Sequence, residues 1–398
     1  MKDPLSAQAL MTHVKVIADE IGPRPTGGMA EGAAHEYIRR TLELSGFKQT
    51  ETMPFMAWNT WTYPLGAPLV FSMLGNLLRY LGGCGYLLGG ALGLTSASLM
   101  VESTRSNTRQ LGALFPKRIA ANVIARVPAS GTQRHKLVFI GHTDTNKERP
   151  SFSERRKKML RATASLSIGV VALNALAQWA QLFGLRKARG LQNLSLLGMI
   201  AAAITLLHDD QEGYIPGAND NASAVACLIG LGQYLQQNPL EHTEVWLAFT
   251  AAEEVGGLGT EKLLDDYGAY LDDAWFIDFE MVGTPRLAYV TEHRSLSYLA
   301  NYKPDAESLA LAQETAMLHP EFQVSGQPVV ITEEVGVLRR RGYRGLCLAG
   351  LGEDGWLANW HRYTDDSAHI DPSGLERAAR FGLAMAQTLD RQIKPTSL

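Results

Sequence analysis

Residues 136–144 read K-L-V-F-I-G-H-T-D, a short apolar run that ends directly in a histidine and an acid. A run of this kind is typical of a strand buried in a parallel sheet. Side chains two positions apart in an extended chain point to the same face, so His142 and Asp144 can act together. One nitrogen of His142 can bind a metal ion while Asp144 orients the ring through the other. An isolated H-x-D pair is more often only the polar end of a strand, so the rest of the chain has to decide.

Four further segments place acids or a histidine after an apolar run or at a helix start. Asp220 lies in G-A-N-D-N-A-S-A at the mouth of a predicted helix, where capping would be its ordinary role. Glu253 and Glu254 follow the apolar run V-W-L-A-F-T-A-A and precede flexible glycines. Glu280 ends I-D-F-E, and His361 lies in the polar loop N-W-H-R-Y-T-D-D. Ligands of open α/β sheets collect at the carboxyl ends of strands, so we expect these side chains to converge.

Together the segments supply two imidazoles and a surplus of carboxylates. This set suits two divalent metal ions that share one carboxylate, with a spare glutamate as proton shuttle. Neighbouring side chains diverge in an extended chain, so of Glu253 and Glu254 one can bind metal while the other reaches a bound water. The pattern predicts hydrolysis by metal-activated water. Zinc is favoured by the mixed ligands, although cobalt or manganese could serve.

Predicted strands alternate with predicted helices along most of the chain. We expect strands at residues 122–127, 136–140, 245–250, 274–279 and 344–348, and helices at 6–20, 29–46, 222–235, 306–318 and 372–392. This alternation predicts an α/β fold with a mixed, mostly parallel central sheet flanked by helices. We treat residues 1–398 as a single catalytic domain that carries two inserted apolar helical hairpins.

The two predicted hairpins cover residues 64–101 and 155–210. The first is almost purely apolar, and the second begins with the basic run R-R-K-K at 155–158. A spanning helix needs roughly 20 apolar residues, which residues 162–185 provide. Each hairpin returns the chain to its starting side, so the basic run predicts a catalytic domain on the cytoplasmic side of a membrane. A soluble helical lid or a dimer surface is the alternative.

Composition excludes several classes of protein. Of the 398 residues, 46% are hydrophobic and 19% charged, which is typical of a globular chain. The net charge of −3 gives no general attraction to nucleic acid. The three cysteines are far apart and odd in number, which argues against a disulfide framework and for a reducing compartment. The N-terminus lacks the apolar core of a signal peptide, so we expect a cytoplasmic protein, with membrane association through the hairpins open. The oligomeric state is also open.

In combination these motifs resemble the co-catalytic zinc aminopeptidases, the family that also holds glutamate carboxypeptidase II, glutaminyl cyclase and the transferrin receptor ectodomain. The likeness covers about residues 12–62, 118–148 and 213–390, and it leaves out the hairpins. It begins with I-G-P-R-P-T-G-G and continues through G-H-T-D, T-A-A-E-E-V-G-G-L-G-T and I-D-F-E-M-V-G. It implies a zinc exopeptidase fold, two metal ions and a peptide substrate.

The resemblance also implies a role for each candidate residue. One ion would be held by His142, Asp220 and Glu280, and the second by Asp220, Glu254 and His361, with Asp220 bridging. Glu253 would be general base and acid, and Asp144 would support His142. Asp365 would match an acid that usually follows the last histidine. Most members of the family cleave the N-terminal residue from a peptide.

The chain departs from the family pattern at three positions, one of which is Ala224 in place of a common glycine. Glu280 stands where the aminopeptidases usually carry aspartate, although a longer arm still ligates. Trp360 precedes His361 where several members carry a tyrosine that polarises the scissile carbonyl. The indole nitrogen can donate one hydrogen bond, and Tyr363 is a substitute candidate for that role.

Three alternative functions remain open at this stage. A carboxypeptidase or dipeptidase would need a cation for the substrate carboxylate, which Arg339, Arg340 or Arg341 could supply. A free-amine preference needs an acid instead, and Glu333 or Glu334 could serve. A glutaminyl cyclase resembles this pattern with one metal, which makes it the weaker alternative. An inactive membrane-associated scaffold would have lost ligands, whereas every ligand position here carries a competent side chain.

Overall fold

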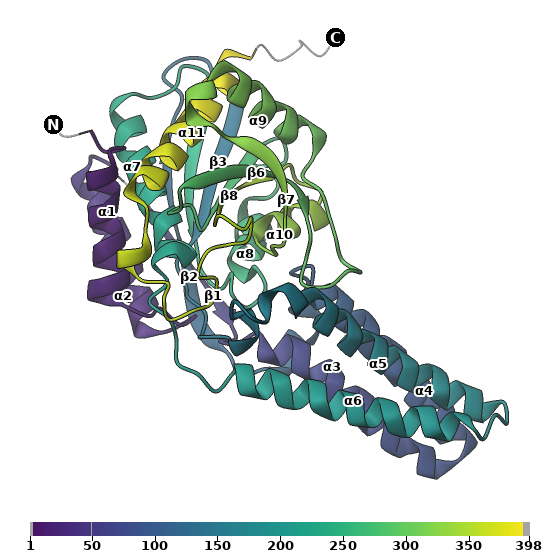
Figure 1. The fold of residues 1–398 in the computed structure, drawn as a ribbon. Helices are drawn as coiled ribbons and strands as arrows, with labels where there is room; N and C mark the ends of the chain where they lie inside the picture. The colour runs from purple at the N-terminus through teal and green to yellow at the C-terminus, as the bar shows by residue number, and fades with distance from the viewer. Residues whose placement is uncertain (1–2, 49, 393–398) are drawn as a thin grey trace, which may run out of the picture.

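An eight-stranded sheet with helices on both faces forms the larger part of the molecule (Figure 1). The structure is a computed structural model, and it describes residues 3–48 and 50–392. The strands are β1 (Thr50–Ala57), β2 (Arg118–Val127), β3 (His135–His142), β4 (Thr243–Thr250), β5 (Trp275–Glu280), β6 (Arg286–His293), β7 (Ser325–Val329) and β8 (Leu346–Leu351). Across the sheet they run in the order β1-β2-β4-β3-β5-β8-β6-β7.

The four central strands, β4, β3, β5 and β8, are parallel to one another. The pairs β1–β2, β2–β4 and β6–β8 are antiparallel, and β6–β7 is parallel. The predicted mixed, mostly parallel sheet flanked by helices is therefore confirmed. Parallel central strands bring their carboxyl ends to one edge, which is where ligands of such sheets bind.

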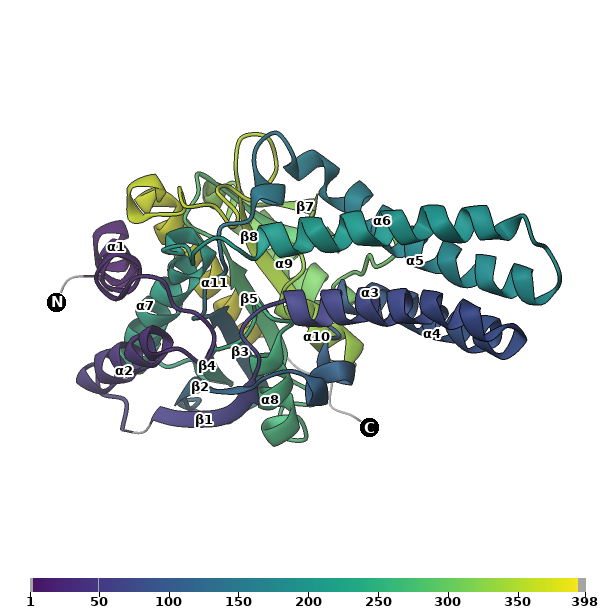
Figure 2. The ribbon, with the colours of Figure 1, turned by 90° about the horizontal axis from the view of Figure 1, so that it is seen from below.

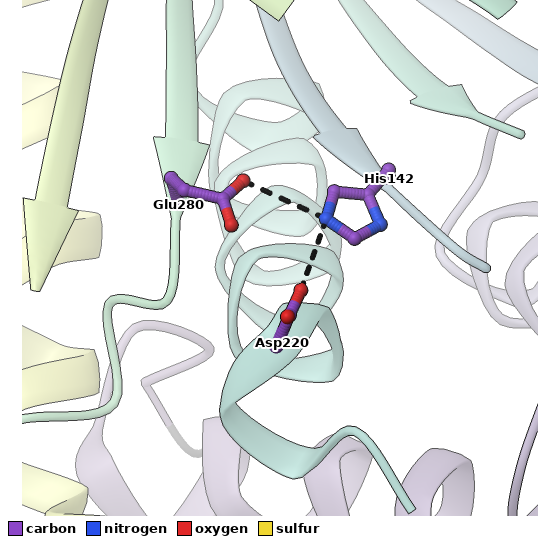
Figure 3. Close-up of side chains that lie close together, drawn as sticks. All are labelled: His142, Asp220 and Glu280. Carbon is purple, nitrogen blue, oxygen red and sulfur yellow. Dashed lines mark ion pairs between the residues drawn. The ribbon is translucent and has the colours of Figure 1, made fainter. Parts of the chain in front are cut away.

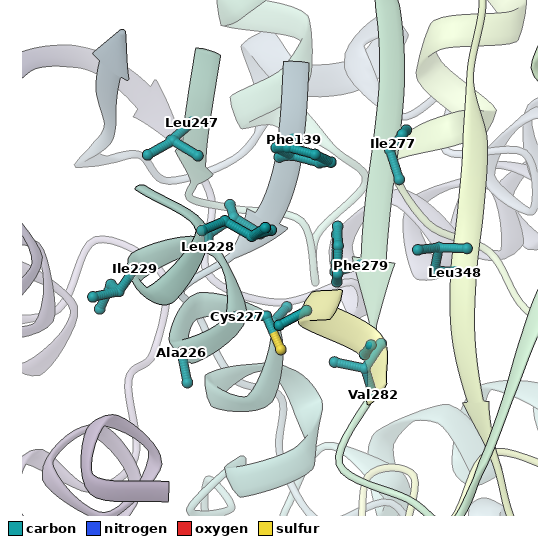
Figure 4. Close-up of a cluster of buried hydrophobic side chains, with 14 of the residues drawn as sticks. Phe139, Ala226, Cys227, Leu228, Ile229, Leu247, Ile277, Phe279, Val282 and Leu348 are labelled. Atoms are coloured by element: carbon teal, nitrogen blue, oxygen red, sulfur yellow. The ribbon is translucent and has the colours of Figure 1, made fainter. Parts of the chain in front are cut away.

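Helices cover the two faces of the sheet. They are α1 (Ala7–Lys15), α2 (Met29–Leu44), α7 (Ser223–Gln237), α9 (Ala306–Leu318) and α11 (Pro372–Arg391) on one face, and α8 (Leu258–Tyr267) and α10 (Glu334–Arg340) on the other. The first core packs α7 directly on the central strands: Leu228 lies between Phe139 of β3 and Leu247 of β4 (Figure 4). Phe139 has no exposed surface because the parallel sheet is covered on both faces.

The two apolar segments form four long helices that stand together as one bundle (Figures 1 and 2). They are α3 (Thr62–Leu77), α4 (Gly83–Ser103), α5 (Leu160–Leu182) and α6 (Ala188–Asp209). The bundle projects from one end of the sheet domain, as Figure 2 shows from below. Two hairpins predicted from the sequence therefore join into one four-helix unit, which we call the bundle.

Polar side chains lie inside the bundle, and large apolar ones face outward. The Nδ2 of Asn76 donates to the Oδ1 of Asn174 at 2.6 Å, and both side chains are fully buried. The exposed apolar residues include Leu74, Leu87, Leu166, Leu197 and Ile204, each more than half exposed. Apolar side chains such as Leu69 and Val171 are also buried in the bundle, but so apolar an outer surface is unlike that of a helix bundle stabilised in water. Three helical stretches, Gly83–Ser103, Lys157–Leu182 and Ala188–Asp209, are long and apolar enough to cross a membrane.

Candidate metal centre

The predicted site residues converge at the carboxyl edge of the central strands. His142 ends β3 and Glu280 ends β5. Glu253 and Glu254 follow β4, and Asp220 lies in the turn just before α7. His361 comes from the loop after β8 and is buried, like the others. Five segments far apart in the sequence thus meet at the edge that the strand pattern predicts.

Two groups of three side chains lie close enough to hold an ion each. The Nε2 of His142 is 3.2 Å from Asp220 Oδ1 and 3.6 Å from Glu280 Oε2 (Figure 3). The Nε2 of His361 is 3.4 Å from Asp220 Oδ2 and 3.1 Å from Glu254 Oε2. In a tetrahedral zinc site with bonds of about 2.0–2.2 Å, ligand atoms are about 3.3–3.6 Å apart. Asp220 offers one oxygen to each group, which is the geometry of a bridging carboxylate.

The chemistry of these atoms fits divalent cations. His142 Nε2, Asp220 Oδ2 and Glu254 Oε1 are buried, and within the described ranges none has a hydrogen-bond partner. A buried polar atom without a partner is costly, and ions held by the two groups would give these atoms partners. Burial raises the pKa of Glu254 to about 7 and that of Glu280 to about 8, although the neighbouring His142 acts to lower both. A cation would reverse that balance.

Glu253 lies beside the first group, with its Oε2 3.9 Å from His142 Nε2. Burial raises the pKa of its carboxyl well above the usual value, which gives the group affinity for a proton. Its backbone N–H donates to Asp144 Oδ1 at 3.1 Å. A carboxylate in this position can exchange protons with a group bound at the centre.

Asp144 contacts His142 mainly through its backbone. The carbonyl oxygen of Asp144 is 3.0 Å from His142 Nδ1, whereas the nearest carboxylate oxygen is 3.6 Å away. The carboxylate instead accepts from Thr26 Oγ1 at 2.8 Å and from the Glu253 N–H. The residue therefore orients the imidazole through its carbonyl and the loop of Glu253 through its side chain, a division of contacts that the sequence did not predict.

The backbone is strained next to the candidate ligands. Ala252, Met281 and His361 have φ of 58°, 52° and 53°, in the left-handed region that non-glycine residues rarely adopt. They precede Glu253, follow Glu280 and form the last ligand itself. Residues in such conformations cost about 1–3 kcal/mol each and concentrate at functional sites.

Asp365 holds the bridging segment in place. Its carboxylate accepts the backbone N–H of Asn219 at 2.6 Å and of Asp220 at 3.0 Å. Burial and the charge of Asp220 raise the pKa of Asp365 well above its usual value. The acid that the resemblance placed after the last histidine thus positions Asp220 rather than contacting His361.

Sequence reasoning missed four residues that support the ligands. Asn146 donates to Glu254 Oε2 at 2.7 Å, and Asn221 donates to Glu280 Oε2 at 3.0 Å. Thr26 holds Asp144, and the fully buried Arg24 donates to the carbonyls of residues 143 and 217. Arg24, Thr26 and Asn221 lie in the motifs I-G-P-R-P-T and N-D-N, but nothing in the sequence says which ligand each one contacts.

Of the three suggested substrate contacts, the structure brings only Trp360 to the centre. Trp360 lines the cavity above the ligands, with its ring centroid 5.3 Å from that of His361. Tyr363 is not among the lining residues, and its hydroxyl accepts the Gly213 N–H at 2.8 Å. Glu333 is also absent from the lining, because it pairs with His293 at 2.8 Å and caps α10.

The arginines considered for a substrate carboxylate have other partners. Arg340 and Arg341 pair with Glu261 at 2.6 and 2.8 Å. Arg339 donates to the Tyr343 carbonyl at 2.7 Å. The cavity above the ligands measures about 70 Å³, and no lysine or arginine is among the described residues that line it.

The sheet order and the ligand edge define a zinc exopeptidase-like fold, and known structures share it. A glutaminyl cyclase of Bacteroides thetaiotaomicron superposes with a TM-score of 0.57 at 14% identity, over 96% of this chain and 98% of that one. A leucine aminopeptidase precursor from the same organism gives 0.55 at 14%, covering 96% and 97%. A zinc aminopeptidase of Bacillus subtilis gives 0.56 at 12%, covering 97% and 95%.

Sequence comparison finds a match to one peptidase family. The model of peptidase family M28 matches residues 203–386. It is similar to the probable lipoprotein aminopeptidase LpqL of Mycobacterium tuberculosis, with 27% identity over 189 residues. That match covers 40% of this chain and 37% of the relative. Both matches agree with the metal-ligand pattern of the site.

Proposed function

We propose that the protein is an aminopeptidase that holds two divalent ions, with zinc the expected metal. His142, Asp220 and Glu280 would hold one ion, and Asp220, Glu254 and His361 the other. The observation that carries the proposal is the position of Asp220, whose two oxygens lie 3.2 Å and 3.4 Å from the two imidazoles. When bound, such ions lower the pKa of a bound water and stabilise negative charge on a carbonyl oxygen.

The residues of the chain would then move one proton. Glu253 accepts it from the attacking water and returns it to the leaving amine, since its buried carboxyl has a raised pKa. Asp144 holds the backbone of Glu253 through a 3.1 Å hydrogen bond, so the carboxyl stays near the centre. Trp360 forms part of the wall of the cavity above the ligands and would limit the access of bulk water.

The lining of the cavity favours an amine over a carboxylate as the recognised end of the peptide. Its charged lining residues, within the described chain, are the acids Asp220, Glu253, Glu254 and Glu280. With the ions bound, their charge offsets the ligand carboxylates, and Glu253 is the lining acid left outside both ligand groups to face an ammonium group. A substrate carboxylate would meet no arginine or lysine among the described lining residues. The second group of ligands, Asp220, Glu254 and His361, favours two ions over the single ion expected of a glutaminyl cyclase.

Turnover of free-amine and N-acetylated dipeptides would test the proposal, with Glu253→Gln as the inactive control. We expect hydrolysis of the free-amine set alone, and a loss of about 10²–10⁴ in rate in Glu253→Gln with metal content unchanged. The exposed Glu241→Gln is the matched control and should behave as wild type. Cleavage of the blocked set would indicate a carboxypeptidase, and full activity in Glu253→Gln would exclude that residue from the proton transfer.

We also propose that the bundle, an insertion of residues 64–101 and 155–210 into the catalytic domain, lies in a lipid bilayer. Its exterior of leucine and isoleucine would otherwise expose a large apolar surface to water. Small residues let its helices approach closely: a Cβ on Gly93 would lie 2.9 Å from that of Ala175. The buried Asn76–Asn174 pair is the kind of polar contact that joins helices inside membranes. The lipoprotein named among the relatives agrees with a membrane location.

The basic run before α5 assigns the catalytic domain to the cytoplasmic side in this proposal. Cys84 provides the test, because it is exposed at the start of α4 while Cys227 and Cys347 are buried. In sealed vesicles, a membrane-impermeant maleimide should label Cys84 only from the side opposite to that on which protease cuts the sheet domain. Cys84→Ser is the control. Labelling and proteolysis from the same side would contradict a spanning bundle.

A further inference from the structure

A second cavity lies where the bundle meets the sheet domain. It measures about 340 Å³, against about 70 Å³ for the cavity above the ligands. Most of its wall is apolar and comes from all four helices of the bundle: Leu65, Leu69, Met100, Leu160, Ile168 and Leu206. We call it the root cavity. Its volume is in the range of sites that bind small organic ligands.

The root cavity adjoins the metal centre. Trp61, Leu65, Thr104 and Leu296 line both cavities, so one wall is shared. Phe152, which lines the root cavity, has its ring centroid 4.6 Å from that of His361. A molecule with a polar end at the ligands can therefore extend its other end into the root cavity.

The junction between the cavities offers a polar contact. The Nε1 of Trp61 is buried, and no described residue accepts a hydrogen bond from it. Its ring packs edge-on against His361 with centroids 5.5 Å apart, so it lies on the boundary between polar and apolar space. An indole N–H that is left unsatisfied favours a ligand with an acceptor at this point.

The charged residues in the root cavity do not offset its apolar character. Asp209 accepts from the backbone N–H of Ser151 at 3.1 Å and thus already has a partner. Arg156 also lines the cavity but is exposed, and the hydroxyls of Thr104, Ser167 and Thr205 donate to backbone carbonyls of their own helices. Most of the remaining wall is leucine, isoleucine, methionine and phenylalanine. Such a wall gains free energy only when apolar groups occupy it.

We propose that the root cavity binds a long unbranched acyl or alkyl chain of the substrate, so that the enzyme hydrolyses amphipathic amides. This rests on the proposed function. A chain fits better than a helix, because a helix with side chains is about 10 Å wide and the cavity holds only about 340 Å³. Water adds to the amide carbon, the carbon–nitrogen bond breaks, and the amine leaves with a proton. With the bundle in a bilayer, the chain would come from the lipid phase.

Two series of free-amine substrates test the proposal. In one, alanine alkylamides place an alkyl chain on the leaving amine. Its length runs from about 2 to about 12 carbons, which is about the range that a cavity of this volume could hold. In the other, anilides of linear 2-amino acids place the chain on the acyl side. We expect kcat/KM to rise about three- to fourfold per methylene in one series until the cavity is full. Short substrates that turn over without any dependence on chain length in either series would overturn the proposal.

A matched pair of variants localises the effect. Ala202 lines the root cavity, whereas its neighbour Ala201 on α6 is exposed. Ala202→Phe should lower the ratio of kcat/KM for the longest over the shortest substrate at least tenfold, and Ala201→Phe should leave that ratio as in wild type. An equal ratio in both variants would place the chain elsewhere. If Ala202→Phe does not fold, the wild-type series still decides.

The outcomes separate this proposal from the one on which it rests. If no substrate of either series is hydrolysed, including the shortest, the aminopeptidase function itself fails. If short substrates are hydrolysed and Glu253→Gln abolishes this, the function holds whatever the chain-length dependence shows. All reactions are run in one detergent, so that partition into micelles is common to both variants.

Discussion

Replacing Asp220 with alanine would separate a bridged pair of ions from two independent sites. Its Oδ1 is 3.2 Å from His142 Nε2, and its Oδ2 is 3.4 Å from His361 Nε2. The substitution removes one of three candidate ligands from each group at once. No other residue in either group belongs to both.

The size of the effect follows from the charges. Two divalent ions about 3.5–4 Å apart repel by on the order of 15–20 kcal/mol at an effective dielectric constant of about 20. Asp220 is the negative charge that lies between them, so its loss leaves this repulsion unbalanced. Replacing a residue that only supports a ligand already costs about 10–100-fold in affinity. We therefore expect Asp220→Ala to lose at least about 100-fold for one ion and to hold one ion or none.

Metal content after dialysis into metal-free buffer, together with calorimetric titration of zinc, would measure the loss. The control is Asp266→Ala, since Asp266 is exposed on α8 and pairs only with Lys262 at 2.7 Å among the described contacts. It should bind metal as wild type does. If Asp220→Ala still holds two ions with affinities within about tenfold of wild type, the bridging assignment is wrong.

Three further predictions concern the support of the site and the stability of the domain. Asn146→Ala removes the 2.7 Å hydrogen bond to Glu254 and should lower the affinity for one of the two ions by about 10–100-fold. A zinc titration should then show one binding step at a weaker affinity than in wild type, and two unchanged steps would contradict this. A chelator should abolish turnover and lower the Tm, because the buried acids Glu254 and Glu280 lose their counter-ion, and added zinc should restore both. Although burial acts to raise the pKa of Glu261, Arg340 and Arg341 lower it below its usual value, so its contribution to stability is present above the unfolded pKa of about 4.3 and is lost as the pH falls through the folded pKa. Glu261→Gln should accordingly lower the free energy of unfolding by about 1–3 kcal/mol at pH 7 and by much less once the pH falls below the folded pKa, and an equal loss in both ranges would refute the ion-pair account.

The central sheet and the ligand edge could be predicted because their signals are local. The apolar run before His142 and the one before Glu253 are strands by composition alone, and polar residues at their ends mark the carboxyl edge. The strands β1, β6 and β7 were not predicted. The sequence of β7, S-G-Q-P-V, has few strand formers and a proline, which an edge strand tolerates but a pattern search rejects.

Partners distant in the sequence could not be predicted. Arg340 and Arg341 looked free to bind a substrate, but Glu261 lies about 80 positions away and takes both. Glu333 looked like an acid near the site, yet it is used by His293. The bundle was predicted as two separate hairpins because an apolar sequence alone does not tell which helices pack against one another. The buried Asn76–Asn174 hydrogen bond, which joins the two hairpins, is seen only in the structure.

Arg149 fixes the bundle and the metal centre to each other. Its backbone N–H donates to the His361 carbonyl at 2.9 Å, its Nε to Asn146 at 3.0 Å, and its Nη1 to the Asp209 carbonyl, at the end of α6, at 3.0 Å. If the bundle lies in a bilayer, as proposed, these hydrogen bonds fix the distance of the metal centre from the membrane surface. The enzyme would then select scissile bonds by their distance from the lipid as well as by the residue that precedes them.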